Sequence, residues 1–211
     1  MRKINISILI MFVVSSVFCQ DFKFPNGVYL THEQFKNRTP AFNTELKTII
    51  RSSEEIFWRG GNLFKFESKN DSLKNEYVKN RIYAYVKNDS VYINCKHHGL
   101  QNWYALAITF GNFVVLKSAV KSDVAFTAAL IGPISSTLVS GNDHLHVLNL
   151  RSGKCKELNK AYIKAALKAF PELLVKFEQE KKQNSMVVLV EYINLLNKMT
   201  APISDIPVEL K

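Results

Sequence analysis

The stretch 81–116 holds the densest β-strand signal in this chain and constrains its fold more than any other segment. Its runs are rich in Tyr, Ile, Val, Trp and Phe, which suit a pleated, half-buried surface. Two short polar sequences, 87–90 and 111–112, divide these runs and have the composition of tight turns. We therefore expect three or four consecutive antiparallel strands here.

The pattern becomes helical towards the C-terminus. After a further predicted strand at 144–150, Asn159 is a suitable N-cap, and apolar residues then recur at the spacing of one helix face up to residue 170. Pro171 suits the first turn of a second helix, and a third apolar helical face spans 186–196. Strands followed by helices predict an α+β fold, an antiparallel sheet of about five to seven strands covered by C-terminal helices.

The N-terminal part of the chain has weaker signals. A brief strand is predicted at 27–30, followed by a helical turn that begins at Thr31, with Gln34 placed to complete a capping box. The alternating run at 63–67 predicts another strand, whereas 42–50 is ambiguous between strand and loop.

Residues 1–19 have the layout of a secretory signal peptide. A basic start at Arg2 and Lys3 precedes an apolar run, and Val17 and Cys19 occupy the positions that a signal peptidase reads. We expect export to the periplasm or the cell surface with cleavage after Cys19, a single α+β domain at 20–199, and a flexible tail at 200–211. Two alternatives stay open: a lipoprotein anchored through Cys19, and a retained N-terminal anchor.

Charge and cysteine content limit the partners. Without Arg2 and Lys3, 26 basic residues stand against 18 acidic ones, a net charge of +8. A basic exported protein is attracted to anionic envelope components or acidic glycans, whereas the scattered positions of its bases favour no specific nucleic-acid site. The remaining cysteines, Cys95 and Cys155, suit one disulfide in an exported protein, although the sequence leaves their proximity open.

Three parts of the sequence together carry a resemblance. They are 27–35 with Pro40, the strand 89–94, and a turn at 152–154 followed by the helix that contains Phe170-Pro171. In this order they resemble a family of uncharacterised exported proteins of Bacteroidota-type bacteria, a domain of unknown function. The resemblance implies a location in a bacterial envelope and brings no activity, cofactor or catalytic residue with it.

Common catalytic motifs are absent from the sequence. There is no Gly-rich phosphate loop, no Gly-x-Ser-x-Gly elbow and no Cys-x-x-Cys pair. The run from His32 to Lys36 begins like a zinc-protease helix, but Lys36 stands where the second histidine would be. The sequence therefore favours an exported, non-enzymatic binding or envelope-associated protein of unknown ligand over an enzyme, with no cofactor expected.

Two alternative functions stay open. Cys95 with His97, and His144 with His146, are pairs two residues apart, and on neighbouring strands they would offer ligands to zinc in a metal-binding protein or metal-dependent enzyme. The uncharged run 124–139 is too short and too interrupted to span a membrane, and it suits either a buried flap or weak contact with a membrane surface.

A ligand-binding surface is predicted from aromatic residues. Tyr83, Tyr85 and Trp103 lie in the strand-rich segment, where an aromatic sheet face would stack on sugars or bases. Core packing and cross-strand pairing explain the same aromatic residues as well.

Overall fold

The computed structural model describes residues 23–69, 73–118 and 144–200. Within these ranges the chain forms the following elements in order: β1 (Gly27–Tyr29), α2 (His32–Lys36), β2 (Leu46–Ile50), α3 (Ser53–Arg59), β3 (Phe64–Ser68), α4 (Asn75–Asn80), β4 (Ala84–Lys87), β5 (Ser90–Asn94), η1 (Cys95–His98), β6 (Tyr104–Ala107), β7 (Phe113–Ser118), β8 (His144–Asn149), β9 (Cys155–Glu157), α5 (Lys160–Ala166), η3 (Leu167–Ala169), α6 (Pro171–Gln179) and α7 (Met186–Met199).

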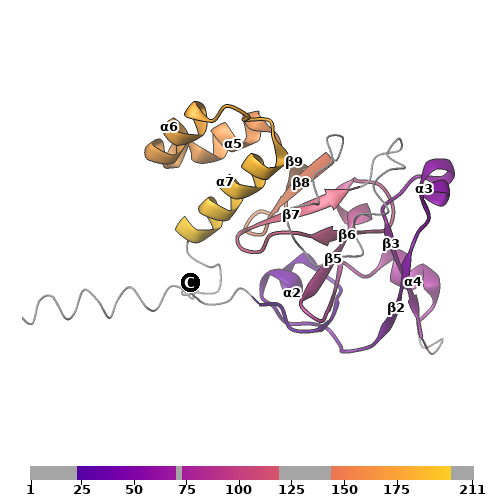
Figure 1. The fold of residues 1–211 in the computed structure, drawn as a ribbon. Coiled ribbons are helices and arrows are strands. Elements are labelled where there is room, and N and C mark those ends of the chain that lie inside the picture. The colour runs from indigo at the N-terminus through magenta and orange to yellow at the C-terminus, as the bar shows by residue number, and fades with distance from the viewer. Residues whose placement is uncertain (1–22, 70–72, 119–143, 201–211) are drawn as a thin grey trace, which may run out of the picture.

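All strand pairs are antiparallel, and seven strands follow the order β1-β4-β5-β6-β7-β8-β9. The other two, β2 and β3, pair along their whole length as a ribbon, which joins this path through one register pair, Phe64 with Tyr104. Figure 1 shows α5, α6 and α7 gathered at the β7–β9 end of the sheet, with the ribbon, α3 and α4 at the other end.

The two faces of the sheet pack against different partners. On β7, Val115 packs with the C-terminal helices through residues such as Ile163 and Ile193, whereas its neighbours Val114 and Leu116 belong to the cluster on the opposite face. This alternation is the expected consequence of the two-residue period of a strand. A third cluster fills the space beneath the ribbon.

Local sequence signals explain where several helices begin. The Thr31 side chain accepts a hydrogen bond from the Gln34 backbone N–H, and Asn159 accepts one from Tyr162 in the same way. These caps satisfy backbone donors that the first turn of a helix leaves unpaired. Pro171 lies in the first turn of α6, where its missing N–H costs no helical hydrogen bond.

The predicted α+β class is confirmed, while the strand count in the described residues is nine rather than five to seven. The brief strand predicted at 27–30 is β1; of the others, β9 has only three residues, and β2 lies in the segment whose pattern was ambiguous. None of the helices in the described ranges has the length and apolar character needed to cross a membrane. The predicted signal peptide at 1–19 and the run 124–139 lie outside the described residues, as does the tail after Thr200.

Candidate functional site

The backbone of Trp103 adopts a conformation that bulky residues rarely take. Its φ is 75°, in the left-handed region that disfavours a side chain with a Cβ. Such a conformation costs on the order of 1–3 kcal/mol and persists only where neighbouring structure enforces it. Residues in this state concentrate at functional sites, which makes Trp103 the first candidate.

Hydrogen bonds from the turn after α3 hold the Trp103 loop in place. Gly61 N–H donates to the Gln101 side chain at 2.5 Å, and Asn62 N–H donates to the Asn102 carbonyl at 2.8 Å. On the other side, Cys95 N–H donates to the Trp103 carbonyl at 2.9 Å. The loop is therefore fixed from two directions.

Gly61 is required by this arrangement. Its φ is +91°, and a Cβ at this position would lie 2.7 Å from Trp103 Cδ1 and 2.8 Å from Arg51 Nη1. The indole thus lies directly against the Gly61 backbone. The sequence Gly60-Gly61, predicted only as a turn, also makes room for Trp103.

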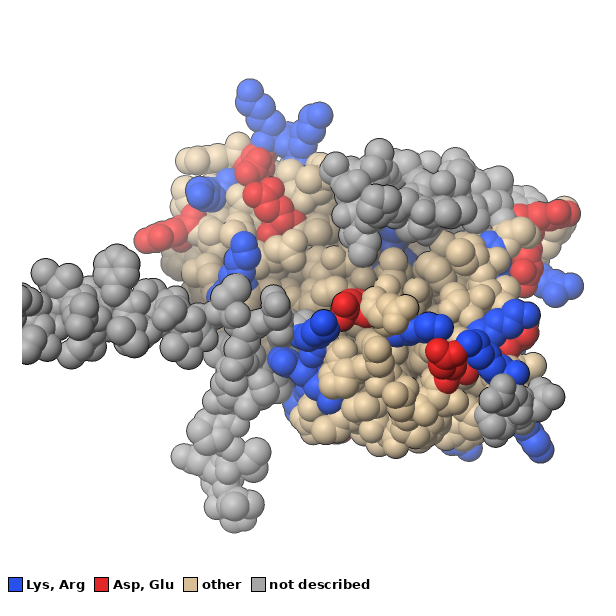
Figure 2. All heavy atoms as spheres, turned by 60° about the horizontal axis from the view of Figure 1, so that its bottom comes forward, with Lys and Arg blue, Asp and Glu red and all other residues tan. Residues whose placement is uncertain are grey.

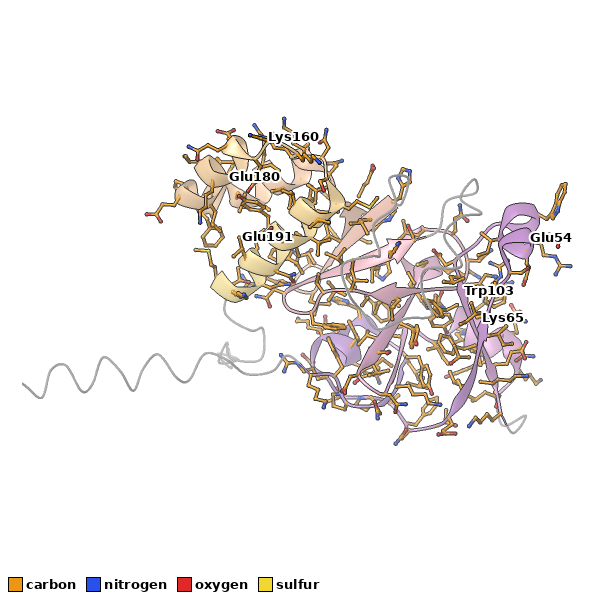
Figure 3. All side chains as sticks on the ribbon, in the orientation of Figure 1. Glu54, Lys65, Trp103, Lys160, Glu180 and Glu191 are labelled. Carbon is orange, nitrogen blue, oxygen red and sulfur yellow. The ribbon has the colours of Figure 1, made fainter. Side chains whose placement is uncertain are left out.

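Three cationic side chains surround the indole of Trp103. The Nζ atoms of Lys65 and Lys79 each lie 5.4 Å from the ring centroid, and the Cζ atom of Arg51 lies 5.9 Å from it. These distances fall within the range of cation–π attraction. The three residues come from β3, α4 and the end of β2, so the ribbon and α4 together bring them to the tryptophan. Figure 3 labels Trp103 and Lys65 side by side below α3.

Arg51 connects this site to α3. Its side chain is fully buried, and Nη1 donates to the carbonyls of Gly60 and Asn62 at 2.8 and 3.0 Å. Its Nε pairs with Glu55 at 3.1 Å, which compensates the buried charge. Arg51 is therefore a structural link rather than a group available to a ligand.

The two lysines remain accessible. Lys65 pairs with Glu67 at 2.6 Å, and its side chain is 28% exposed. Lys79 is half-buried, and within the described ranges it has no ion pair. With Trp103 also half-buried, the surface combines a partly exposed indole with two ammonium groups that lie over its ring. Such a surface suits a ligand that carries both an apolar ring face and an acidic group.

The basic residues elsewhere are arranged differently. On the face drawn in Figure 2, Lys and Arg atoms are scattered and interleaved with Asp and Glu. A shallow hollow of about 580 Å³ lies at the start of α7, lined by Lys160, Glu180, Lys181, Lys182, Gln183, Asn184 and Ser185. Lys160 and Glu180 lie at the helical end of the molecule, away from Trp103 (Figure 3). No aromatic side chain lines this hollow, so it lacks a stacking surface.

The other two predicted ligand-binding aromatics are buried. Tyr83 is 5% exposed and Tyr85 is 2% exposed, and they belong to different core clusters. Tyr83 precedes the first residue of β4, so the two do not share a strand face. The Tyr85 hydroxyl accepts a hydrogen bond from Leu46 N–H at 3.2 Å, which leaves Trp103 as the partly exposed member of the predicted trio.

Histidines surround Tyr83. His32 Nε2 lies 2.9 Å from the Leu150 carbonyl, which can only accept, so Nε2 carries the hydrogen. In the neutral ring, Nδ1 then accepts a hydrogen bond from the Tyr83 hydroxyl at 3.0 Å. The rings of His97 and His98 lie 5.7 and 5.4 Å from that of Tyr83.

Burial shifts the pKa values of Tyr83 and His98 in this cluster. Burial raises the pKa of Tyr83 above its ordinary value. Burial, together with His97 and His32, lowers the pKa of His98 to about 4, and its Nε2 atom has no hydrogen-bond partner within the described part of the chain. Sequence reasoning did not place His32 and His98 beside Tyr83, because the contacts of both with Tyr83 depend on the tertiary fold.

The predicted metal ligands are distributed over two places. Cys95 and His97 lie in η1, and His144 and His146 lie in β8. Across the described ranges, no group of three or more His, Cys, Asp or Glu side chains is placed to hold a metal ion. The zinc group of Cys95, His97, His144 and His146 stays a prediction.

Both cysteines of the described domain carry free thiols. Cys95 is buried in the core cluster that contains Tyr83, and Cys155 packs against the same cluster. Burial raises the pKa of Cys95 to about 12 and that of Cys155 to about 11, so neither is a thiolate at neutral pH.

Ser118 and His146 form a hydrogen-bonded pair that resembles part of a hydrolase triad. Ser118 Oγ lies 2.9 Å from His146 Nδ1 and donates to the His144 carbonyl at 3.2 Å. A hydroxyl has one proton, so a serine that donates to the carbonyl accepts from the histidine. In that arrangement His146 is not a base for Ser118, and the serine is 6% exposed.

Comparison with known proteins gives a family and no function. Residues 27–200, well over half of the chain, match the model of a family of unknown function, DUF6563. No curated protein and no solved structure matches the chain. The chain therefore belongs to the DUF6563 family of unknown function.

Proposed function

We propose that this protein is an exported binding protein of a bacterial envelope and that the surface around Trp103 binds an acidic glycan. The observation that carries the proposal is the convergence of Lys65 and Lys79 on a half-buried indole with a left-handed backbone. A strained aromatic residue between two accessible ammonium groups is costly to maintain for packing alone.

The physical basis of recognition is a match of ring and charge. The apolar face of a sugar ring packs on an indole, and a carboxylate or sulfate on that sugar pairs with a lysine. Counted with Glu55 and Glu67, the three cations leave a net charge of +1 at this surface. That balance favours a ligand with about one acidic group per sugar over a densely charged polyanion.

Export is supported by the layout of residues 1–19 and by the basic composition of the chain. We propose a periplasmic or surface location, with a mature chain that begins at Gln20. Mass analysis of the N-terminal peptide from an envelope fraction tests this, and we expect Gln20 at the start. A lipid on Cys19 or an uncut Met1 would contradict the cleavage.

The binding proposal is tested on mature protein by affinity electrophoresis in gels that contain polygalacturonate, with neutral dextran as the reference polymer. We expect the wild type to be retarded by the acidic polymer alone. Trp103→Ala should weaken the interaction about tenfold, because it removes the stacking surface. Lys65→Gln with Lys79→Gln should weaken it as much and reduce its sensitivity to salt.

A matched control removes the same amount of charge elsewhere. Lys181 and Lys182 lie in the basic hollow without an aromatic residue, and both are exposed. Their double replacement by Gln should leave the affinity within about twofold of wild type. An equal loss in this control, or no retardation of the wild type, would overturn the proposal.

A further inference from the structure

Trp58 is the most exposed large hydrophobic residue in the described part of the chain. Its side chain on α3 is 75% exposed, whereas most tryptophans in folded proteins are largely covered. Ile50, the last residue of β2 before Arg51 and α3, is 52% exposed. Apolar groups in such a position are typical of a contact surface.

Trp58 lies close to the Trp103 surface. Trp103 packs against Gly61, which follows Trp58 by three residues. A separation of three residues limits the distance between the Cα atoms of Trp58 and Gly61 to about 11 Å. Figure 3 labels Trp103 and Lys65 below α3, at the end of the molecule where Glu54 lies on that helix. The two tryptophans of the protein are therefore neighbours on one end of the fold.

The connection between them is rigid. Arg51 donates to the Glu55 carbonyl within α3 at 3.3 Å and to the carbonyl of Gly60, the C-cap of that helix, at 2.8 Å. The same guanidinium lies 5.9 Å from the Trp103 ring. Because one buried side chain contacts both parts, the backbone of α3 that carries Trp58 is held in place relative to the Trp103 ring.

Basic residues occur near both tryptophans. Trp103 has Lys65 and Lys79, and Trp58 is followed directly by Arg59, which is exposed. The α3 end of the fold thus carries two tryptophans and several accessible basic side chains. A ligand that contacts both tryptophans presents a ring and an acidic group more than once, as an acidic polysaccharide chain does.

We infer that Trp58 and Arg59 form a second subsite, so that the protein binds an extended acidic polysaccharide rather than a single acidic sugar. This inference rests on the proposed function of the Trp103 surface. In this arrangement Trp103 contacts every ligand that binds, and Trp58 contacts a ligand long enough to reach α3. Affinity therefore rises with chain length until both tryptophans are covered.

The test uses full-length mature protein and a graded series of galacturonic acid oligomers, from the monomer upward, with titration calorimetry as the readout. Trp58→Ala should lower the affinity for long oligomers three- to tenfold and leave that for the shortest binding oligomer unchanged. Trp103→Ala should lower the affinity at every length. Because Trp58 is exposed, its replacement should leave the thermal unfolding midpoint unchanged.

The outcomes separate the two proposals. If Trp103→Ala weakens binding but Trp58→Ala has the same small effect at all lengths, the second subsite is wrong and the proposed function stands. If neither variant changes the affinity, both are wrong. If Trp58→Ala lowers flotation with anionic phospholipid vesicles and leaves oligomer binding unchanged, Trp58 is a membrane contact and the inference is overturned.

Discussion

The surroundings of Trp103 and of Tyr83 differ in one physical respect, although both place several titratable side chains around an aromatic ring. Around Trp103 the groups are lysines and an arginine, and the ring is half-buried. Around Tyr83 they are histidines, and the ring is 5% exposed. The first ring is partly exposed among cations, and the second ring is buried among imidazoles.

The difference follows from what each side chain does when water is removed. A histidine can lose its proton near neutral pH, so burial lowers the pKa of His98 and its ring remains uncharged at modest cost. Arginine keeps its charge in proteins, and Arg51 is buried only because Glu55 and two carbonyls compensate it. A charged cluster is thus suited to binding anions, and a neutral one to packing.

The largest expected effect concerns the buried arginine. Arg51→Met leaves the carbonyls of Gly60 and Asn62 without their donor and Glu55 without its partner. We expect the free energy of unfolding to fall by about 3–5 kcal/mol, measured by urea denaturation. Arg59→Met on the same helix is the control, with an expected change within about 0.5 kcal/mol. A loss below about 1 kcal/mol in Arg51→Met would show that Arg51 is not the link described above.

The next effect concerns the contribution of His98 to the stability of the fold at acid pH. The unfolded chain binds a proton at His98 near pH 6.5, whereas the folded chain does so only near pH 4. Between these values the unfolded state holds the extra proton, so stability is lost as the pH falls from about 6.5 to 4. We expect this group to remove about 2–3 kcal/mol over that window.

His98→Phe tests the contribution. The variant should be close to wild type in stability at pH 7, and its loss on going to pH 4 should be smaller than that of wild type by the same 2–3 kcal/mol. The difference between the two profiles therefore reports the loss of the His98 imidazole together with its electrostatic coupling to neighbouring side chains. Parallel pH profiles for the two proteins would mean that His98 is not buried as described.

The fold could be predicted further from the sequence than the site could. The strands of 81–116 and the caps at Thr31 and Asn159 depend on neighbours in sequence, and the structure contains them. The ribbon strand β2 was ambiguous, because its exposed residues and its basic neighbour Arg51 gave no clear alternation.

The contacts of the site depend on tertiary structure. The cationic residues around the indole are separated from Trp103 by up to 52 positions in the sequence. Local patterns do not reveal which distant lysines contact the ring. Tyr83 and Tyr85 looked equivalent to Trp103 because composition does not show burial. The one local hint was Gly60-Gly61, whose small residues leave space for a close approach.

A smaller effect is expected for the hydroxyl of Tyr83. Tyr83→Phe removes the hydrogen bond to His32 Nδ1 and should lower the free energy of unfolding by about 1 kcal/mol. Tyr77→Phe is the control, since the Tyr77 hydroxyl has no hydrogen-bond partner in the described part of the chain, and its change should stay within about 0.5 kcal/mol. Equal losses in the two variants would contradict the pairing of Tyr83 with His32.

The smallest effect is expected for an accessible lysine of the Trp103 surface. Lys79→Gln removes one cation–π contact and should cost about 0.5–1 kcal/mol of stability. In a Trp58→Phe background it should also shift the fluorescence of Trp103, whereas Lys168→Gln on the exposed surface should change neither quantity. An unchanged emission spectrum in the Lys79 variant would place its ammonium away from the indole.

The attachment of the β2–β3 ribbon has a consequence for local opening. The ribbon meets the main sheet through a single register pair, Phe64 with Tyr104, and it carries Lys65. The ribbon is otherwise held by side-chain packing, such as that of Phe66 on Tyr85 and Tyr104, rather than by backbone pairing. We therefore expect it to open as one cooperative unit, with ribbon amides exchanging with solvent before those of β7 and β8. A ligand that bridges Lys65 on the ribbon to Trp103 on the main sheet would close this unit. Binding should then slow hydrogen exchange throughout the ribbon, including at amides that do not contact the ligand.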